Sequence, residues 1–364
     1  MITFTKQPNK TLENAFNNQV FEFYAENGMS CKVLISDGTI TREINIDAMS
    51  GAFYMNAKSS VLSIFNTNNF ADVVVPTIIS FLINDASLFR SIAYSFTVSY
   101  LNGTTENVVI TKLYSKAVDN LLKPLAVENA VFRPFLNNTY INCYEGLPFD
   151  ITFYSNIARS VVITNKRTGL SVTKSFTAGV NRLFFSNGEN NKGFELELPL
   201  VVGVINQLEF VSGSLLCTLE VFKHAECEAP YLKWFNSRGG WSYFRFSKVY
   251  QEGLSASNND FLNNDFDNIE TTVSNFQATG KTASNSLALD SDILQANEID
   301  NFVDIFTSPK VFYYATGQNQ PMTLYSFKEV SLNSSAIELR NSKFDTHRYD
   351  VTIELPSYNT QTYV

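Results

Sequence analysis

The chain has very little of the chemistry that most enzymes and metal sites use. Its 364 residues include only two histidines and four cysteines. The histidines, His224 and His347, are far apart in the sequence. No GxSxG motif occurs, so we expect no histidine-based catalytic triad. The cysteines form no CxxC pair, so we expect free, buried thiols instead of a zinc ribbon or a disulfide framework.

Phosphate-binding loops and long hydrophobic runs are also missing. Neither GxGxxG nor GxxxxGK[ST] occurs, which leaves no loop of the kind that holds nucleotides. The most apolar stretch, residues 73–83, is too short to cross a bilayer and contains Pro76. The first residues show no basic start followed by an apolar run, so no secretory signal is expected. The sequence therefore predicts no cofactor, no catalytic residue and no membrane segment.

Charge is scarce, and aromatic side chains are abundant. Charged residues make up 17 % of the chain, and 27 basic against 35 acidic side chains leave a net charge of −8. An acidic protein repels phosphates, so specific nucleic-acid binding is not expected. The 31 phenylalanines and 17 tyrosines indicate strands, because aromatic rings fit pleated, half-buried surfaces. The composition therefore predicts a mainly β protein.

Short apolar runs separated by turn residues predict two antiparallel β-sandwich domains, residues 1–120 and 121–229. Hairpins are expected where an Asx-Gly pair stands between such runs, at 27–28, 37–38 and 102–103. The third domain, residues 230–364, is expected to be β-rich and mixed. Its one amphipathic helix is predicted within 291–306, before Pro309. Residues 255–283 are polar and are interpreted as a long loop.

Two groups of residues could be drawn as metal sites, and both are incomplete. Cys217, His224 and Cys227 lie near Glu226, but no fourth ligand stands at a recognised zinc spacing. The acidic segment 263–270 matches the first ligand positions of an EF-hand calcium loop. Ser274 stands where that loop requires a bidentate glutamate. We therefore expect no metal at either place.

The segment 231–246 reads YLKWFNSRGGWSYFRF. It resembles the lysine–tryptophan–leucine–asparagine … glycine–glycine … aromatic segment of virion proteins from phages that infect Bacteroidetes, including the crAss-like group. It departs from that segment at Phe235 and Ser242, where leucine and an acidic residue are usual. The structural motif within this segment consists of Trp234, Asn236, Gly239, Gly240 and Trp241. The order of parts also fits, from the opening residues 4–8 to the helix followed by 308–314 and the closing strand 349–356.

This resemblance implies a non-enzymatic structural subunit of a short-tailed phage tail, of the hub, ring or adaptor type. Such a subunit is synthesised in the host bacterial cytoplasm and works in the virion. It forms a homo-oligomeric ring of sixfold or twelvefold symmetry and contacts other tail proteins. Four acidic residues would then belong to an assembly loop or face the tail channel, with a solvated or partner-binding loop as the alternative: Asp260, Asp265, Asp267 and Glu270.

A carbohydrate- or receptor-binding β-sandwich module is the alternative function. Trp241 and Tyr243 share one face of a predicted strand and, with Trp234, could stack on a sugar, although core positions are more usual for such residues. The paired carboxylates of a glycoside hydrolase are not recognisable in a sequence, because their separation is spatial. The adjacent Gly239 and Gly240 predict a turn or bulge with positive φ, where a side chain is penalised.

Overall fold

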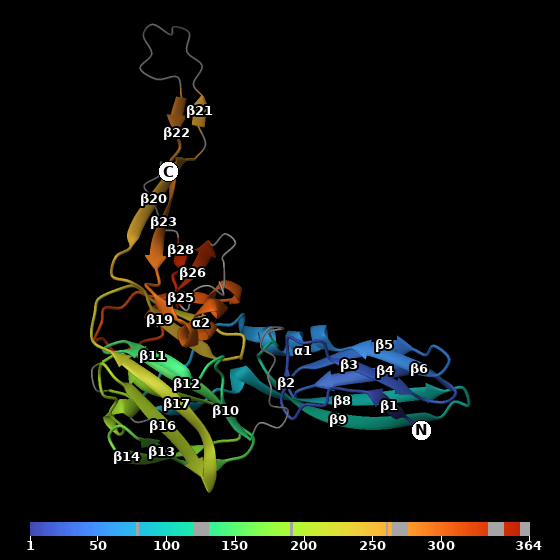
Figure 1. The fold of residues 1–364 in the computed structure, drawn as a ribbon. Coiled ribbons are helices and arrows are strands. Elements are labelled where there is room, and N and C mark those ends of the chain that lie inside the picture. The colour runs from blue at the N-terminus through green and yellow to red at the C-terminus, as the bar shows by residue number, and fades with distance from the viewer. Residues whose placement is uncertain are drawn as a thin grey trace.

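The computed structural model describes residues 1–77, 80–119, 131–189, 192–259, 261–263, 276–333 and 346–356. Within these residues the chain is mainly β, as predicted, with two α-helices and several short 3₁₀ helices. In Figure 1 the N-terminal part extends to one side, the middle part lies below, and the C-terminal part lies above it and carries a projecting ribbon. The 3₁₀ helices are η1 (Asn66–Asn68), η2 (Ala86–Leu88), η3 (Phe194–Leu196) and η5 (Val303–Thr307).

The N-terminal part is a sandwich of a five-stranded and a three-stranded sheet. Phe96 of the larger sheet contacts Phe21 and Phe23 of the smaller one, with ring centroids 5.3 and 5.4 Å apart. The five strands, in sheet order, are β2 (Glu13–Asn14), β9 (Thr105–Ser115), β8 (Phe89–Tyr100), β4 (Gly28–Ser36) and β5 (Thr41–Asp47). The three are β1 (Thr3–Lys6), β3 (Val20–Tyr24) and β6 (Ala52–Asn56).

Two of the three predicted hairpins form in this sandwich. The turn at 37–38 joins β4 to β5, and the turn at 102–103 joins β8 to β9. The third prediction is wrong, because β3 and β4 belong to different sheets and the turn at 27–28 carries the chain between them. Asn27 adopts φ of 60° there. A helix that was not predicted, α1 (Lys58–Phe65), follows β6 and buries Val61, Ile64 and Phe65.

The middle part is a second sandwich, in which Phe153 and Phe210 meet across the two sheets at 5.0 Å. One sheet contains β10 (Phe132–Pro134), β12 (Pro148–Ser155), β15 (Gly179–Asn187) and β7 (Leu82–Asn84). The other contains β11 (Tyr140–Tyr144), β17 (Ser214–His224), β16 (Ile205–Ser212), β13 (Arg159–Asn165) and β14 (Leu170–Phe176). Strand β7 comes from the first third of the chain and pairs with β15. The domain boundaries near 120 and 229 stay predictions.

The C-terminal part is built on a seven-stranded sheet. Its strands, in order, are β19 (Trp241–Arg245), β18 (Tyr231–Phe235), β25 (Val311–Tyr314), β26 (Phe327–Asn333), β28 (Asp350–Glu354), β23 (Lys281–Asp290) and β20 (Gln251–Asn258). A two-residue pairing joins β24 (Leu294–Gln295) to β27 (Thr346–His347). Helix α2 (Ala296–Phe302) lies within the predicted range and begins at a capping box between Gln295 and Glu298. It continues into η5 and buries Ile299, Phe302 and Ile305.

The polar stretch 255–283 is not simply a loop. Eight residue pairs join β20 to β23, from Gln251 opposite Ala288 to Asn258 opposite Lys281. A further pairing of β21 (Phe261–Asn263) with β22 (Phe276–Ala278) continues in the same direction (Figure 1). Strand β23 joins β28 only from Ser286 onward. The ladder forms between backbones, so a segment of serine, asparagine and threonine with no apolar face gave no strand signal.

Candidate functional site

The residues that carry the resemblance lie together on β18, β19 and the turn between these strands. Asn236 organises the turn with all of its amide hydrogen-bonding atoms. Its Nδ2 donates to the Phe135 carbonyl and to Ser242 Oγ, each at 3.0 Å, and its Oδ1 accepts from the amides of Arg238 and Gly240, also at 3.0 Å. A fully satisfied buried amide fixes one turn geometry.

The two glycines allow this turn to contact the other two parts of the molecule. Gly239 has φ of +89°, and a Cβ there would lie 3.0 Å from the Lys116 carbonyl oxygen, just past β9. A Cβ on Gly240 would lie 2.9 Å from the Thr152 Cβ of β12. The predicted positive φ is therefore present at Gly239 alone. Position 240 requires glycine for a different reason, because Thr152 lies too close to leave room for a side chain.

The two tryptophans are core residues. Trp234 is 1 % exposed and meets Phe302 of α2 edge-on at 6.1 Å. Trp241 is 3 % exposed and packs against Phe235 and Phe312. Tyr243 is also buried, and its hydroxyl donates to Asp150. The hypothesis that these rings form a sugar-stacking platform is wrong, because none of them offers a face to solvent.

Next to Tyr243 lies a buried ionic cluster that the sequence analysis did not find. Arg182, which is fully buried, binds Asp150 through Nε and Nη2 at 2.9 and 2.8 Å and Asp72 through Nη1 at 2.6 Å. Lys233 of β18 binds the other Asp72 oxygen at 2.9 Å. Asp85 completes the cluster, 3.5 Å from Arg182 Nη1. Three carboxylates thus share two cations.

Charges within the cluster shift the pKa values of its own members. Burial alone would raise the pKa of Asp72, but Arg182 and Lys233 lower it far below its usual value. Burial lowers the pKa of Lys233, and Asp72 opposes that shift. These side chains pair with each other and hold together the parts of the chain that supply them. We call this cluster of Asp72, Asp85, Asp150, Arg182 and Lys233 the ionic lock. It ties a segment near residue 72 to the middle sandwich and to the C-terminal sheet. No short sequence pattern could have indicated this cluster, because its members are spread along the sequence from position 72 to position 233.

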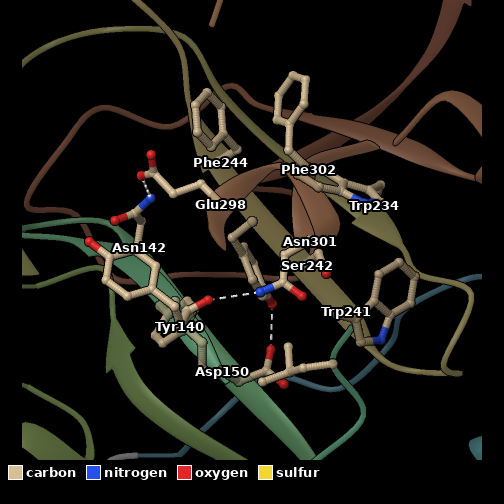
Figure 2. Close-up of a pocket in the computed structure, with 14 residues that line it drawn as sticks. Tyr140, Asn142, Asp150, Trp234, Trp241, Ser242, Phe244, Glu298, Asn301 and Phe302 are labelled. Atoms are coloured by element: carbon tan, nitrogen blue, oxygen red, sulfur yellow. Dashed lines mark hydrogen bonds between the residues drawn. The ribbon is translucent and has the colours of Figure 1, made fainter. Parts of the chain in front are cut away.

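A small cavity lies between the motif and α2 (Figure 2). Its volume is about 30 Å³, which is room for a single water molecule and not for a substrate. Asn301 of α2 closes one side, donating to the Tyr140 carbonyl at 2.8 Å and accepting from the amides of Asn137 and Asn138. Glu298 accepts from Asn142. The cavity therefore lies at the interface where α2 packs against the middle sandwich.

The residues considered for metal binding do not assemble. Among the residues that the structure describes, no three His, Cys, Asp or Glu side chains are grouped to hold an ion. His224 stacks on Tyr144 at 4.9 Å, and its Nε2 lies 3.0 Å from Asn142 Oδ1. Burial and the nearby Arg245 lower the pKa of His224 to about 4. All four cysteines are free, and Cys31 and Cys143 are buried.

Some predicted site residues cannot be placed. Asp260, Asp265, Asp267 and Glu270 lie outside the described residues, as does most of the segment considered for calcium. No helix in the described ranges has the length and apolar character needed to cross a membrane.

No protein family and no curated protein matches this sequence. Among solved structures, it is similar to a tetra-tandem repeat from the extending region of a large adhesion protein, at 10 % identity and a TM-score of 0.23. That match covers all of this chain and 66 % of the other. The native form of Escherichia coli alpha-2-macroglobulin matches at 8 % identity and a TM-score of 0.23, over 79 % of this chain and 21 % of the other.

A 1.5-MDa bacterial ice-binding adhesin matches at 11 % identity and a TM-score of 0.19, over 80 % of this chain and 92 % of the other. This chain thus spans less than two thirds of the length of the first two structures. Similarity at these TM-scores carries no argument about function.

Proposed function

We propose that this protein is a non-enzymatic structural subunit of a phage virion tail. In this proposal it assembles into a ring of sixfold or twelvefold symmetry and contacts other tail proteins. The observation that carries the proposal is the ribbon of β20 and β23, which projects from the body of the molecule (Figure 1).

The ribbon has the character of an assembly arm. Seven of the eight β20 residues are exposed, including Leu254 at 67 %. The part of β23 that precedes Ser286 pairs with β20 alone among the described strands. A lone two-stranded ribbon is marginally stable in water. A neighbouring subunit that covers the ribbon in a ring would supply the missing burial.

The body of the molecule is suited to a structural role. The residues of the motif that resembles virion proteins make contacts inside the molecule. Asn236 orders the turn, and both tryptophans are buried. The ionic lock joins the segment near Asp72 to the middle sandwich and to the C-terminal sheet. The same burial argues against the carbohydrate-binding alternative, because the aromatic residues on which it depended are inaccessible.

The proposal is tested first on particles. Virions of the phage that encodes this chain should contain it, at a copy number that is a multiple of six, when purified and quantified by mass spectrometry against the major capsid protein. Absence from purified virions would contradict the proposal. A single copy per particle would contradict the ring.

A second test addresses the ribbon. A variant that joins Leu254 to Asn285 through a two-residue turn removes the outer ribbon while keeping the β23–β28 pairing. We expect this variant to keep the melting temperature of the parent but to lose ring assembly, measured by native mass spectrometry and by incorporation into tails. The control substitutes Asn102→Gly at the exposed β8–β9 tip and should assemble as the parent does. Normal incorporation of the ribbon-deleted variant would overturn the assignment of the ribbon.

A further inference from the structure

A second cavity, of about 310 Å³, lies where the N-terminal sandwich meets the turn between β18 and β19. Three phenylalanines from separate segments line it: Phe16, Phe70 and Phe235. Two lysines, Lys58 of α1 and Lys116 just beyond β9, also line it, and among the described residues no aspartate or glutamate does. Its volume is at the lower end of the range for small-molecule sites.

Lys116 is the unusual member of this lining. It is 1 % exposed, yet no ion pair joins it to a carboxylate in the described part of the chain. Its ammonium lies 3.9 Å from the centre of the Phe70 ring, and its one hydrogen bond is to Asn68 Oδ1 at 3.3 Å. The ammonium also lies 6.0 Å from the centre of the Phe235 ring. Two cation–π contacts and a long neutral hydrogen bond offset only part of the cost of burying a charge.

Three other buried cations of this protein are paired with carboxylates. Lys233 is paired with Asp72, Lys223 with Glu195, and Arg182 with two aspartates. An unpaired buried ammonium beside an aromatic-walled cavity therefore has an unmet requirement for an anion. Burial also lowers the pKa of Lys116 to about 8; Arg90 adds to that shift and Asp85 opposes it.

We propose that this cavity binds a small aromatic carboxylate, whose ring packs among Phe16, Phe70 and Phe235 and whose carboxylate pairs with Lys116. Lys58 at the cavity wall adds a second positive charge. The aromatic walls select an apolar body, and the lack of a lining carboxylate selects a negative head group. This inference is independent of the proposed role in a phage tail.

The experiment uses the full chain and 2-naphthoate as the probe, with 2-naphthalenemethanol as its uncharged counterpart of similar size. In isothermal titration calorimetry we expect 2-naphthoate to bind at least tenfold more tightly than the alcohol. In the Lys116→Met variant this preference should disappear. The Lys166→Met control, which removes an exposed lysine paired with Glu209, should keep it. Equal affinities of the parent for acid and alcohol, or no binding of either, would overturn the proposal.

A second measurement needs no variant. Saturation with 2-naphthoate should slow the trinitrophenylation of Lys116 at least fivefold and leave that of Lys166 unchanged, as quantified by peptide mass spectrometry. Binding that leaves Lys116 labelling unchanged would show that the carboxylate lies elsewhere, and this too would overturn the proposal.

Discussion

Arg182 and Asp150 form a two-pronged ion pair across neighbouring strands, with Nε 2.9 Å from Oδ2 and Nη2 2.8 Å from Oδ1. Both side chains are fully buried. The pair lies where segments far apart in the sequence meet, since Asp72 and Lys233 extend it on either side. Each polar atom excluded from water here depends on a partner from a distant part of the sequence.

Removing the shared cation should therefore be severe. We expect Arg182→Met to lower the free energy of unfolding by about 3–5 kcal/mol, because it leaves three buried carboxylates with only Lys233 as counter-charge. Guanidinium denaturation followed by circular dichroism measures the effect. The pair of the exposed Lys166 with the half-buried Glu209 provides the control, since Lys166→Met should cost less than about 1 kcal/mol. A similar cost for both variants would contradict the lock.

The turn between β18 and β19 offers a matched comparison of glycines. Gly239 and Gly103 have similar positive φ values, +89° and +79°, but a Cβ on Gly103 would meet nothing within 4 Å. We expect Gly239→Ala to cost about 1–3 kcal/mol, from strain together with contact on the Lys116 carbonyl. Gly103→Ala should cost only the strain. Equal changes in melting temperature would show that the contact with Lys116 is unimportant.

A Cβ on Gly240 tests the second contact of the same turn. Its φ is not positive, so any cost of Gly240→Ala comes from the approach to Thr152 and Phe135. We expect about 1–3 kcal/mol of destabilisation, as for other overpacked core positions. Thermal unfolding of Gly240→Ala in the parent and in a Thr152→Gly background isolates this contact, and the cost should be smaller in the Thr152→Gly background. An equal cost in both backgrounds would show that crowding against Thr152 is not the cause.

His224 predicts an acid sensitivity. Its pKa is lowered to about 4 in the folded protein by burial and by Arg245, against the usual 6.5 in an unfolded chain. Between these values the unfolded chain binds the extra proton, so falling pH favours unfolding. The contribution of His224 is complete above pH 6.5 and is lost progressively toward pH 4.

The His224→Asn variant isolates this effect. From pH 7 to pH 5 the parent should lose about 1 kcal/mol more unfolding free energy than the variant, after allowance for the partial exposure of the ring. Urea denaturation at the two pH values provides the measurement. Parallel losses in both proteins would show that His224 does not titrate between them.

Lys116 predicts a pH dependence of the same sign on the alkaline side, with stability rising as pH rises. Its pKa is about 8 in the folded protein because of burial and Arg90, with Asp85 opposing, against 10.5 in the unfolded chain. Below pH 8 the buried charge destabilises the fold, so Lys116→Met should be more stable than the parent. As pH rises from 8 to 10.5 the folded parent loses the proton first, and the advantage of the variant should shrink. The melting temperatures of both proteins should be measured from pH 8 to pH 10.5. A difference in melting temperature that stays constant or widens would contradict a buried charge on Lys116.

The sequence by itself determined the β class, most of the strands and two hairpins. Alternating apolar residues and Asx-Gly pairs act locally, so β3, β25 and the turns at 37–38 and 102–103 could be predicted from neighbouring residues alone. The helix within 291–306 was recognisable for the same reason, from the spacing of Ile299, Phe302 and its neighbours.

Only the tertiary structure decided what these elements do. The crossing at 27–28, the strand β7 in the middle sandwich, the ionic lock and the unpaired Lys116 depend on contacts between residues far apart in the sequence. The burial of Trp241, and with it the loss of the sugar-stacking hypothesis, was likewise decided by which parts of the chain pack against β19. Charge pairing and burial are properties of three-dimensional neighbours, and a residue's own type and spacing do not specify them.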